Sequence, residues 1–146
     1  MDKKRARQIQ TIVRLINTNF TADDFFVTLT YSGDLEPKSE EQARRNVQNY
    51  IRRLKKYMAK GGLPELKYIY VTDRGRYCYH HLILSGEISK EKIEALWFQK
   101  HGLVMRVEHL PGDNQKIANI AAYIVKGPES GRVNCSLKRQ NQEEKL

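Results

Sequence analysis

Hydrophobic positions in the first half of the chain follow helical and extended periods in turn. In residues 3–17 the apolar side chains recur every three or four positions, which predicts an amphipathic helix with a basic outer side. Residues 25–31 are aromatic and β-branched with partial alternation, which predicts a central strand. Ser39 precedes a helical stripe over 43–58, and Gly61 marks its end, so we expect a second helix capped by Ser39.

The second half of the chain alternates in the same way. We expect its elements at the following positions: strands at 66–72 and 77–84, a helix from Ser89 through Trp97, a strand at 102–110, a helix at 115–125 and a short strand at 132–137. The turn-forming residues 73–76 make the first two of these strands a hairpin. After the N-terminal helix the order is β-α-β-β-α-β-α. It predicts an α+β fold of ferredoxin-like type, an antiparallel sheet with two helices on one face.

Length and polarity bound the domain organisation. A chain of 146 residues is long enough for one core and too short for two, so we expect a single domain over residues 1–138. The polar residues 139–146 are expected to form a disordered tail.

Charge points to a polyanionic partner. Lysine and arginine outnumber aspartate and glutamate by 26 to 17, which gives a formal net charge of +9. Such a surplus favours nucleic acid through counterion release. The side chains that we expect to contact DNA lie on the first, second and last helices: Lys3, Lys4, Arg5, Arg7, Arg44, Arg45, Arg52, Arg53, Lys116 and Asn119.

Several classes of protein are disfavoured. Cys78 and Cys135 are too few for a disulfide framework. No run approaches the roughly 20 apolar residues of a membrane span, and the start does not resemble a signal peptide. No G-x-x-x-x-G-K-[ST] motif is present, so we expect no nucleotide cofactor. The protein is therefore expected to be cytoplasmic and without membrane contact.

Two adjacent histidines on a predicted strand are candidate metal ligands. Alternate side chains of a strand share a face, so only one of His80 and His81 can point toward a given site. Asp73, at the end of the neighbouring strand, is the obvious carboxylate. Imidazole and carboxylate on one face would bind Mn²⁺ or Mg²⁺ and leave positions open for a phosphate oxygen. The alternative is that both histidines are ordinary sheet residues, one packed and one exposed.

The last predicted helix carries a polar stripe. Lys116, Asn119, Tyr123 and Lys126 recur at intervals of three, four and three, opposite an apolar stripe. Tyr123 is therefore a candidate nucleophile, and Lys126 a candidate for holding a phosphate. A phenol titrates near 10, so a divalent ion and Lys126 would have to activate it. The alternative is that Tyr123 is a boundary residue that packs its ring.

Four segments in this order carry a family resemblance. They are Phe26-Val27-Thr28-Leu29-Thr30-Tyr31, Val71-Thr72-Asp73-Arg74-Gly75, His80-His81-Leu82-Ile83-Leu84-Ser85-Gly86 and Tyr123-Ile124-Val125-Lys126. Together they resemble the motifs of rolling-circle replication initiators, the HUH endonucleases. The likeness is greatest to the replication-associated proteins of bacterial plasmids, phages and integrated elements, and it runs from about Arg5 to Lys138.

The resemblance implies a metal-dependent, single-tyrosine DNA nickase and strand transferase with an HUH endonuclease fold. It implies that Tyr123 becomes joined to a 5′ phosphate, that Asp73 and His81 bind Mn²⁺ or Mg²⁺, and that Lys126 assists. His80 stays a candidate ligand. The implied partners are single-stranded or hairpin origin DNA, a helicase and a polymerase, in a bacterial cytoplasm.

The chain departs from the family pattern at the first histidine of the H-x-H motif, where it has Tyr79. A second register would pair Cys78 with His80, but the register of Tyr79 and His81 aligns the following Leu-Ile-Leu-Ser-Gly best. A phenol is a poor ligand for Mg²⁺ or Mn²⁺, and a thiol is a soft one. Alternatives are thus a DNA-binding derivative with weak or no cleavage, and a single-tyrosine transposase of the same superfamily. An RNA-binding module ranks low because the strands lack its pair of exposed aromatics with flanking glycines.

Overall fold

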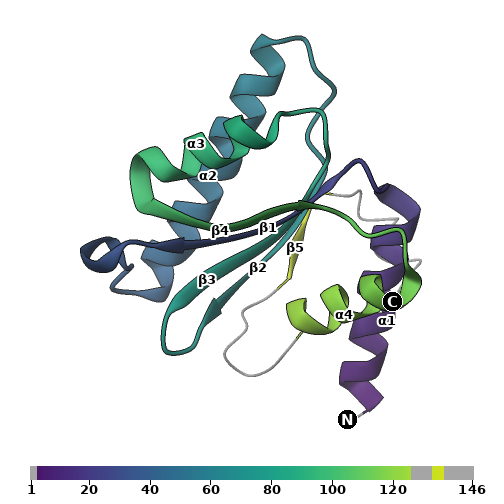
Figure 1. The fold of residues 1–146 in the computed structure, drawn as a ribbon. Helices are drawn as coiled ribbons and strands as arrows, with labels where there is room; N and C mark the ends of the chain where they lie inside the picture. The colour runs from purple at the N-terminus through teal and green to yellow at the C-terminus, as the bar shows by residue number, and fades with distance from the viewer. Residues whose placement is uncertain (1–2, 126–132, 137–146) are drawn as a thin grey trace.

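The computed structural model describes residues 3–125 and 133–136 (Figure 1). Within these residues the elements follow one another as α1 (Lys3–Asn19), β1 (Phe25–Tyr31), the short 3₁₀ turn η1 (Gly33–Leu35), α2 (Glu40–Lys60), β2 (Tyr68–Arg74), β3 (Cys78–Leu84), α3 (Lys90–His101), β4 (Gly102–His109), α4 (Asn114–Ile124) and β5 (Asn134–Cys135). Lys126 and the tail expected at 139–146 lie outside the described residues. No helix in the described part of the chain has the length and apolar character needed to cross a membrane.

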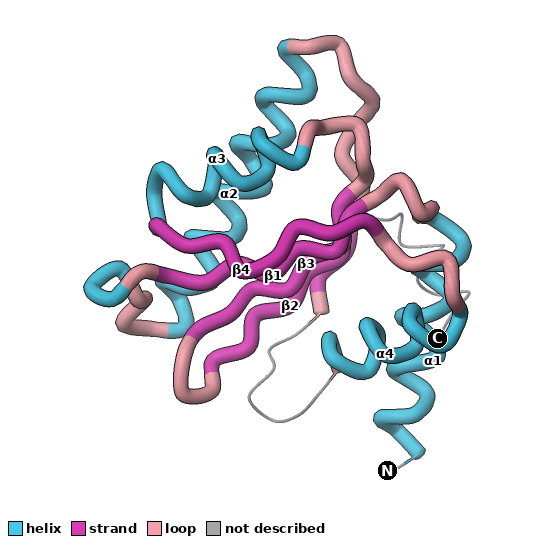
Figure 2. The backbone as a smooth tube through the Cα atoms, in the orientation of Figure 1, coloured by secondary structure: helices cyan, strands magenta, loops and turns pink. Residues whose placement is uncertain are grey.

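The strands form one sheet in the order β4-β1-β3-β2-β5, and every neighbouring pair is antiparallel. Helix α2 connects β1 to β2, and α3 connects β3 to β4, and both helices lie on the same face of the sheet (Figures 1 and 2). This arrangement confirms the predicted α+β fold with its antiparallel sheet.

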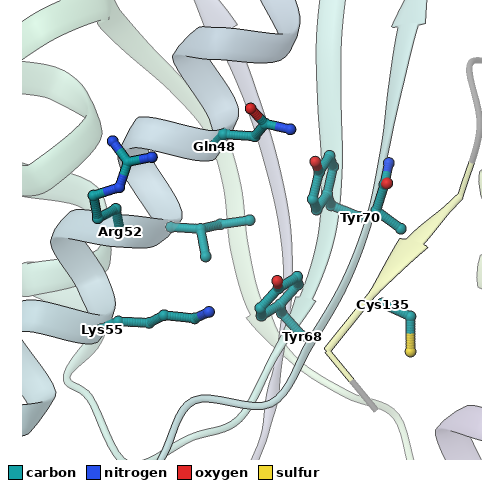
Figure 3. Close-up of a pocket in the computed structure, with 8 residues that line it drawn as sticks. Gln48, Arg52, Lys55, Tyr68, Tyr70 and Cys135 are labelled. Atoms are coloured by element: carbon teal, nitrogen blue, oxygen red, sulfur yellow. The ribbon is translucent and has the colours of Figure 1, made fainter. Parts of the chain in front are cut away.

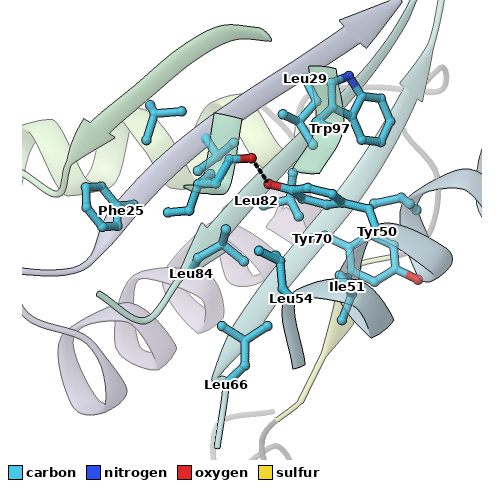
Figure 4. Close-up of a cluster of buried hydrophobic side chains, with 14 of the residues drawn as sticks. Phe25, Leu29, Tyr50, Ile51, Leu54, Leu66, Tyr70, Leu82, Leu84 and Trp97 are labelled. Carbon is cyan, nitrogen blue, oxygen red and sulfur yellow. Dashed lines mark hydrogen bonds between the residues drawn. The ribbon is translucent and has the colours of Figure 1, made fainter. Parts of the chain in front are cut away.

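The larger core lies between the sheet and the pair α2 and α3 (Figure 4). Tyr50 and Trp97 are its largest fully buried side chains, and their rings meet edge to face at 5.3 Å. The Tyr50 hydroxyl donates a hydrogen bond to the Ile93 carbonyl oxygen at 2.7 Å, and the Trp97 indole donates to the Thr30 carbonyl oxygen at 2.7 Å. Each buried polar group therefore has a partner, which spares the core their desolvation cost.

A second layer, which the sequence analysis did not place, covers the other face of the sheet. Helices α1 and α4 pack there in a separate core with Phe26, Ile69, Val71 and Ile83 of the strands. Because both faces are covered, all seven residues of β1 are buried. That explains why its hydrophobic alternation is only partial.

Local capping follows the predicted chemistry. The Ser39 hydroxyl accepts a hydrogen bond from the Gln42 amide at the start of α2, and the Ser89 hydroxyl accepts one from the Lys92 amide at the start of α3. Both predicted caps are thus confirmed. Helix α3 ends at Gly102, whose φ of 89° is the left-handed conformation that glycine adopts without strain.

The hairpin differs from its prediction in one way that matters for the site. Strand β2 continues to Arg74, and the turn occupies residues 75–77 rather than 73–76. Asp73 is therefore inside the ladder, where it pairs with Tyr79.

Asp24 joins three separate parts of the fold. Its side chain accepts hydrogen bonds from the amides of Thr21 at 2.8 Å and Gly86 at 2.6 Å, and its carbonyl oxygen accepts one from the Leu110 amide. We expect Asp24→Ala to lower the free energy of unfolding by about 3 kcal/mol, because two charge-assisted hydrogen bonds are lost. Urea denaturation measures this, and Asp23→Ala, at an exposed neighbour, should change stability by less than about 0.5 kcal/mol. Equal effects of the two substitutions would show that Asp24 has no such role.

Candidate active site

The strands bring a set of polar residues to the face that α1 and α4 cover. Thr28 and Val71 both pair with His81, and Asp73 pairs with Tyr79. Residues paired directly across strands share a face, and so do alternate residues of one strand. Thr28, Asp73, Tyr79 and His81 therefore lie together on this face, near the hairpin end of β2 and β3.

Helix α4 adds Tyr123 to this set. The ring of Tyr123 meets the ring of His81 edge to face, with centroids 4.7 Å apart. Tyr79 stacks on the other neighbour position, with centroids 6.3 Å from His81 and the planes within 10°. The Tyr123 side chain is 47% exposed, whereas Ile124 beside it is buried. Tyr123 thus combines contact with His81 and access to solvent.

The two candidate ligands on this face are held on rigid strands. His81 is 1% exposed, and its Nδ1 lies 3.3 Å from the Thr28 hydroxyl. Asp73 is 3% exposed and stands diagonally across the β2–β3 pair from His81. Diagonal neighbours are about 7–8 Å apart at the backbone, which lets their side chains reach one shared ion. Thr28 was not singled out from the sequence, although its parity with residues 26 and 30 is the signal that could have found it.

His80 points the other way, into the core under α2 and α3. It is fully buried, its Nδ1 lies 2.8 Å from the Thr72 hydroxyl, and its Nε2 lies 2.6 Å from the Tyr31 hydroxyl. Burial lowers the pKa of His80 to about 3, so its ring is neutral at pH 7. The expectation that His80 serves as a ligand beside Tyr123 therefore does not fit the geometry, because the sheet separates the two.

The same geometry decides between the two registers of the H-x-H motif. Cys78 lies on the face of His80, where burial raises the pKa of its thiol to about 12 and keeps it protonated. Tyr79 and His81 are the pair that faces α4. The register of residues 79 and 81 is thus the one that meets Tyr123.

The donor set on the α4 face is small. Within the described ranges, no group of three or more His, Cys, Asp or Glu residues gathers as a metal site. Asp73 and His81 supply one carboxylate and one imidazole, with the phenol of Tyr79 in the third place. Such a pair suits a hard divalent ion that takes its other ligands from water and from a substrate phosphate.

Arg5 of α1 holds the end of the helix that carries Tyr123. Its Nε donates a hydrogen bond to the Val125 carbonyl oxygen at 2.6 Å, and its Nη2 donates to the Ala122 carbonyl oxygen at 3.3 Å. These carbonyls belong to the last turn of α4, where a cation is stabilised by the helix dipole. Arg5 was expected to contact DNA, and its guanidinium is instead engaged within the protein. Sequence could not reveal this, because backbone acceptors carry no residue signature.

The other expected DNA contacts fall on three helices. Lys3, Lys4 and Arg7 are exposed on α1, and Lys116 and Asn119 are exposed on α4 beside Tyr123. The Asn119 side-chain oxygen accepts a hydrogen bond from the Gln115 side chain at 3.1 Å.

On α2 the expected contacts divide between two sides. Arg44, Arg45 and Arg52 are exposed, and Arg45 forms an ion pair with Glu41 at 3.0 Å. Arg53 is half-buried and donates a hydrogen bond to the Leu96 carbonyl oxygen of α3 at 3.1 Å. Arg53 therefore ties α2 to α3 and is the member of this group least available to a ligand.

Comparison with known proteins finds one family. A family model described as replication-associated protein ORF2 matches residues 24–128, which run from the start of β1 past the end of α4. The match includes Asp73, His81, Tyr123 and Lys126, whereas α1 precedes it. No curated protein matches the chain, and no solved structure matches it. Because the match spans more than half of the sequence, the chain belongs to this family of replication-associated proteins.

Proposed function

We propose that the protein is a metal-dependent DNA nickase and strand transferase that initiates rolling-circle replication, with Tyr123 as its nucleophile. The observation that carries this proposal is the contact between the half-exposed Tyr123 ring and His81, on the face that also holds Asp73. Membership of a replication-associated family supports a role in DNA replication. The substrate in this proposal is single-stranded or hairpin origin DNA, and a separate helicase and polymerase continue the process.

The reaction exchanges one phosphodiester for another. The Tyr123 oxygen forms a bond to phosphorus while the bond from phosphorus to the 3′ oxygen of the DNA breaks. The phenol proton leaves and the 3′ oxygen gains one, so the products are a 5′-phosphotyrosine and a free 3′ hydroxyl. Attack by a 3′ hydroxyl on the phosphotyrosine reverses the step and reseals a strand, with no oxidant or water consumed.

Asp73 and His81 are the residues that would hold Mn²⁺ or Mg²⁺. The ion would supply positive charge at the phosphate oxygens as the phosphorus is attacked. Thr28, close to the Nδ1 of His81, orients the imidazole, which is the usual task of a group behind a metal ligand. The proposed role of Lys126 in holding the phosphate rests on its place in the sequence.

A DNA-binding derivative with weak or no cleavage is the second candidate. It is favoured by Tyr79, which occupies the third donor position and stacks on His81 where a further imidazole would complete the ligand set. The two candidates differ in whether a covalent intermediate forms, so the same assay separates them.

Removing the Tyr123 hydroxyl tests the nucleophile. Incubation with a pool of single-stranded oligonucleotides of random sequence and Mn²⁺ should give a covalent adduct on a denaturing gel. Tyr123→Phe should abolish it, because the ring stays and the attacking oxygen is lost. Tyr77→Phe, at another exposed tyrosine, is the control and should leave the adduct unchanged. An adduct that survives in Tyr123→Phe, or none in the wild type with any divalent ion, would refute the proposal.

Position 79 tests the metal site. Tyr79→His adds an imidazole beside His81, and we expect the Mn²⁺ concentration for half-maximal adduct formation to fall about ten-fold, a change typical of a group that supports a metal site. Tyr79→Phe keeps the ring without a donor and should leave that concentration unchanged. If both variants behave like the wild type, residue 79 does not face the ion.

Arg5 tests whether α1 positions the nucleophile. Arg5→Gln removes the charged hydrogen bonds to the end of α4, and we expect the rate of adduct formation to fall about ten-fold, the equivalent of one such bond. Arg7→Gln removes the same charge from an exposed site on α1 and should leave the rate near that of the wild type. The DNA affinities of the two variants should agree within about two-fold. A loss of affinity in Arg5→Gln alone would instead mark Arg5 as a DNA contact.

A further inference from the structure

A groove lies on the face of the sheet opposite Tyr123, between α2 and the edge formed by β2 and β5 (Figure 3). Its volume is about 350 Å³, within the range of ligand-binding sites. Side chains of Gln48, Arg52 and Lys55 come from α2, and those of Tyr68 and Tyr70 come from β2. None of these residues belongs to the proposed active site.

The helical wall of this groove is cationic. Arg44, Gln48, Arg52 and Lys55 are exposed and recur at intervals of four, four and three, so they follow one side of α2. None of the four is acidic, and the carboxylate of Glu41 at the start of the helix is paired with Arg45. The side of α2 that faces the groove therefore offers positive charge and amide groups over about three turns.

The strand wall is aromatic. Tyr68 and Tyr70 are alternate residues of β2 and share a face, with ring centroids 6.0 Å apart and planes at 30°. The Lys55 ammonium lies 5.1 Å from the centroid of the Tyr68 ring. Tyr70 is 5% exposed and its side chain hydrogen-bonds with Gln48, whereas Tyr68 is only half-buried. Tyr68 is thus the ring that a ligand can reach.

We propose that this groove binds a stretch of single-stranded DNA, with phosphates along Arg52 and Lys55 and a base against the Tyr68 ring. A positively charged groove beside an accessible aromatic ring is the combination with which proteins hold unpaired strands. A base in a duplex is stacked between its neighbours and is not free to lie on a protein side chain, so the ligand is unpaired DNA.

The groove and the proposed active site lie on opposite faces of one strand. Tyr70 precedes Asp73 by three residues of β2, which is about 10 Å along a strand. A DNA segment that flanks the cleaved phosphate can pass around the β5 edge from one face to the other. The inference rests on the proposed function for its choice of DNA, but it does not require Tyr123 to cleave.

Binding without chemistry tests the groove. Fluorescence anisotropy with labelled oligothymidylate, in EDTA and in the Tyr123→Phe background, excludes cleavage and metal binding. We expect Arg52→Gln with Lys55→Gln to weaken binding at least ten-fold. It should also make the slope of log K against log salt shallower by about 1.4, as expected for two lost phosphate contacts on a single strand. Lys90→Gln with Lys100→Gln removes the same charge from exposed positions of α3 and should change affinity by less than about three-fold.

Tyr68→Leu separates stacking from charge. It should weaken oligothymidylate binding about ten-fold and leave the salt slope unchanged, because a base contact and not a phosphate contact is lost. Unchanged melting temperatures by circular dichroism establish that the variants are folded. Equal affinity and equal slope for the groove and α3 variants would overturn the proposal. A groove effect without any wild-type adduct would refute only the nickase, and an adduct without a groove effect would refute only the groove.

Discussion

The two-residue period of β3, with both faces of its sheet covered by helices, is the constraint on which the site depends. Because alternate side chains point to opposite faces, His80 and His81 enter different environments although they are adjacent. His80 joins Tyr31 and Thr72 in a buried hydrogen-bonded network, and His81 meets Tyr123. A shift of one residue in the register of β3 would exchange these roles and place the wrong histidine beside the tyrosine.

The layer formed by α1 and α4 gives the site its second half. Strand residues alone would supply Asp73 and His81 but no nucleophile, since Tyr123 comes from α4. The apolar contacts between α1, α4 and the sheet hold the body of α4, and Arg5 holds its last turn. Helix α1 precedes the residues that the family model matches, so this chain supports a family-typical helix with a contact from outside that region.

Much of this arrangement could be predicted from local chemistry. The caps at Ser39 and Ser89, the helical and extended periods and the antiparallel order were all recoverable, because each depends on residues close in sequence. The second helical layer was missed, since a strand buried on both faces loses its alternation. The end of β2 was placed before Asp73 because Asp-Arg-Gly-Arg is turn-forming by composition, whereas cross-strand pairing with Tyr79 extends the ladder. The groove beside Tyr68 unites residues far apart in the chain, and no local pattern marks it.

The most direct test of the account is to identify the residue that carries the DNA. Trypsin cleaves after Lys116 and Lys126, and residues 117–126 contain Tyr123 as their one side-chain hydroxyl. After reaction with single-stranded DNA and Mn²⁺ and digestion with nuclease and trypsin, mass spectrometry should find a 5′-linked nucleotide on this peptide. A nucleotide on any other peptide, or a peptide 117–126 that stays unmodified under conditions that cleave the DNA, would contradict the account.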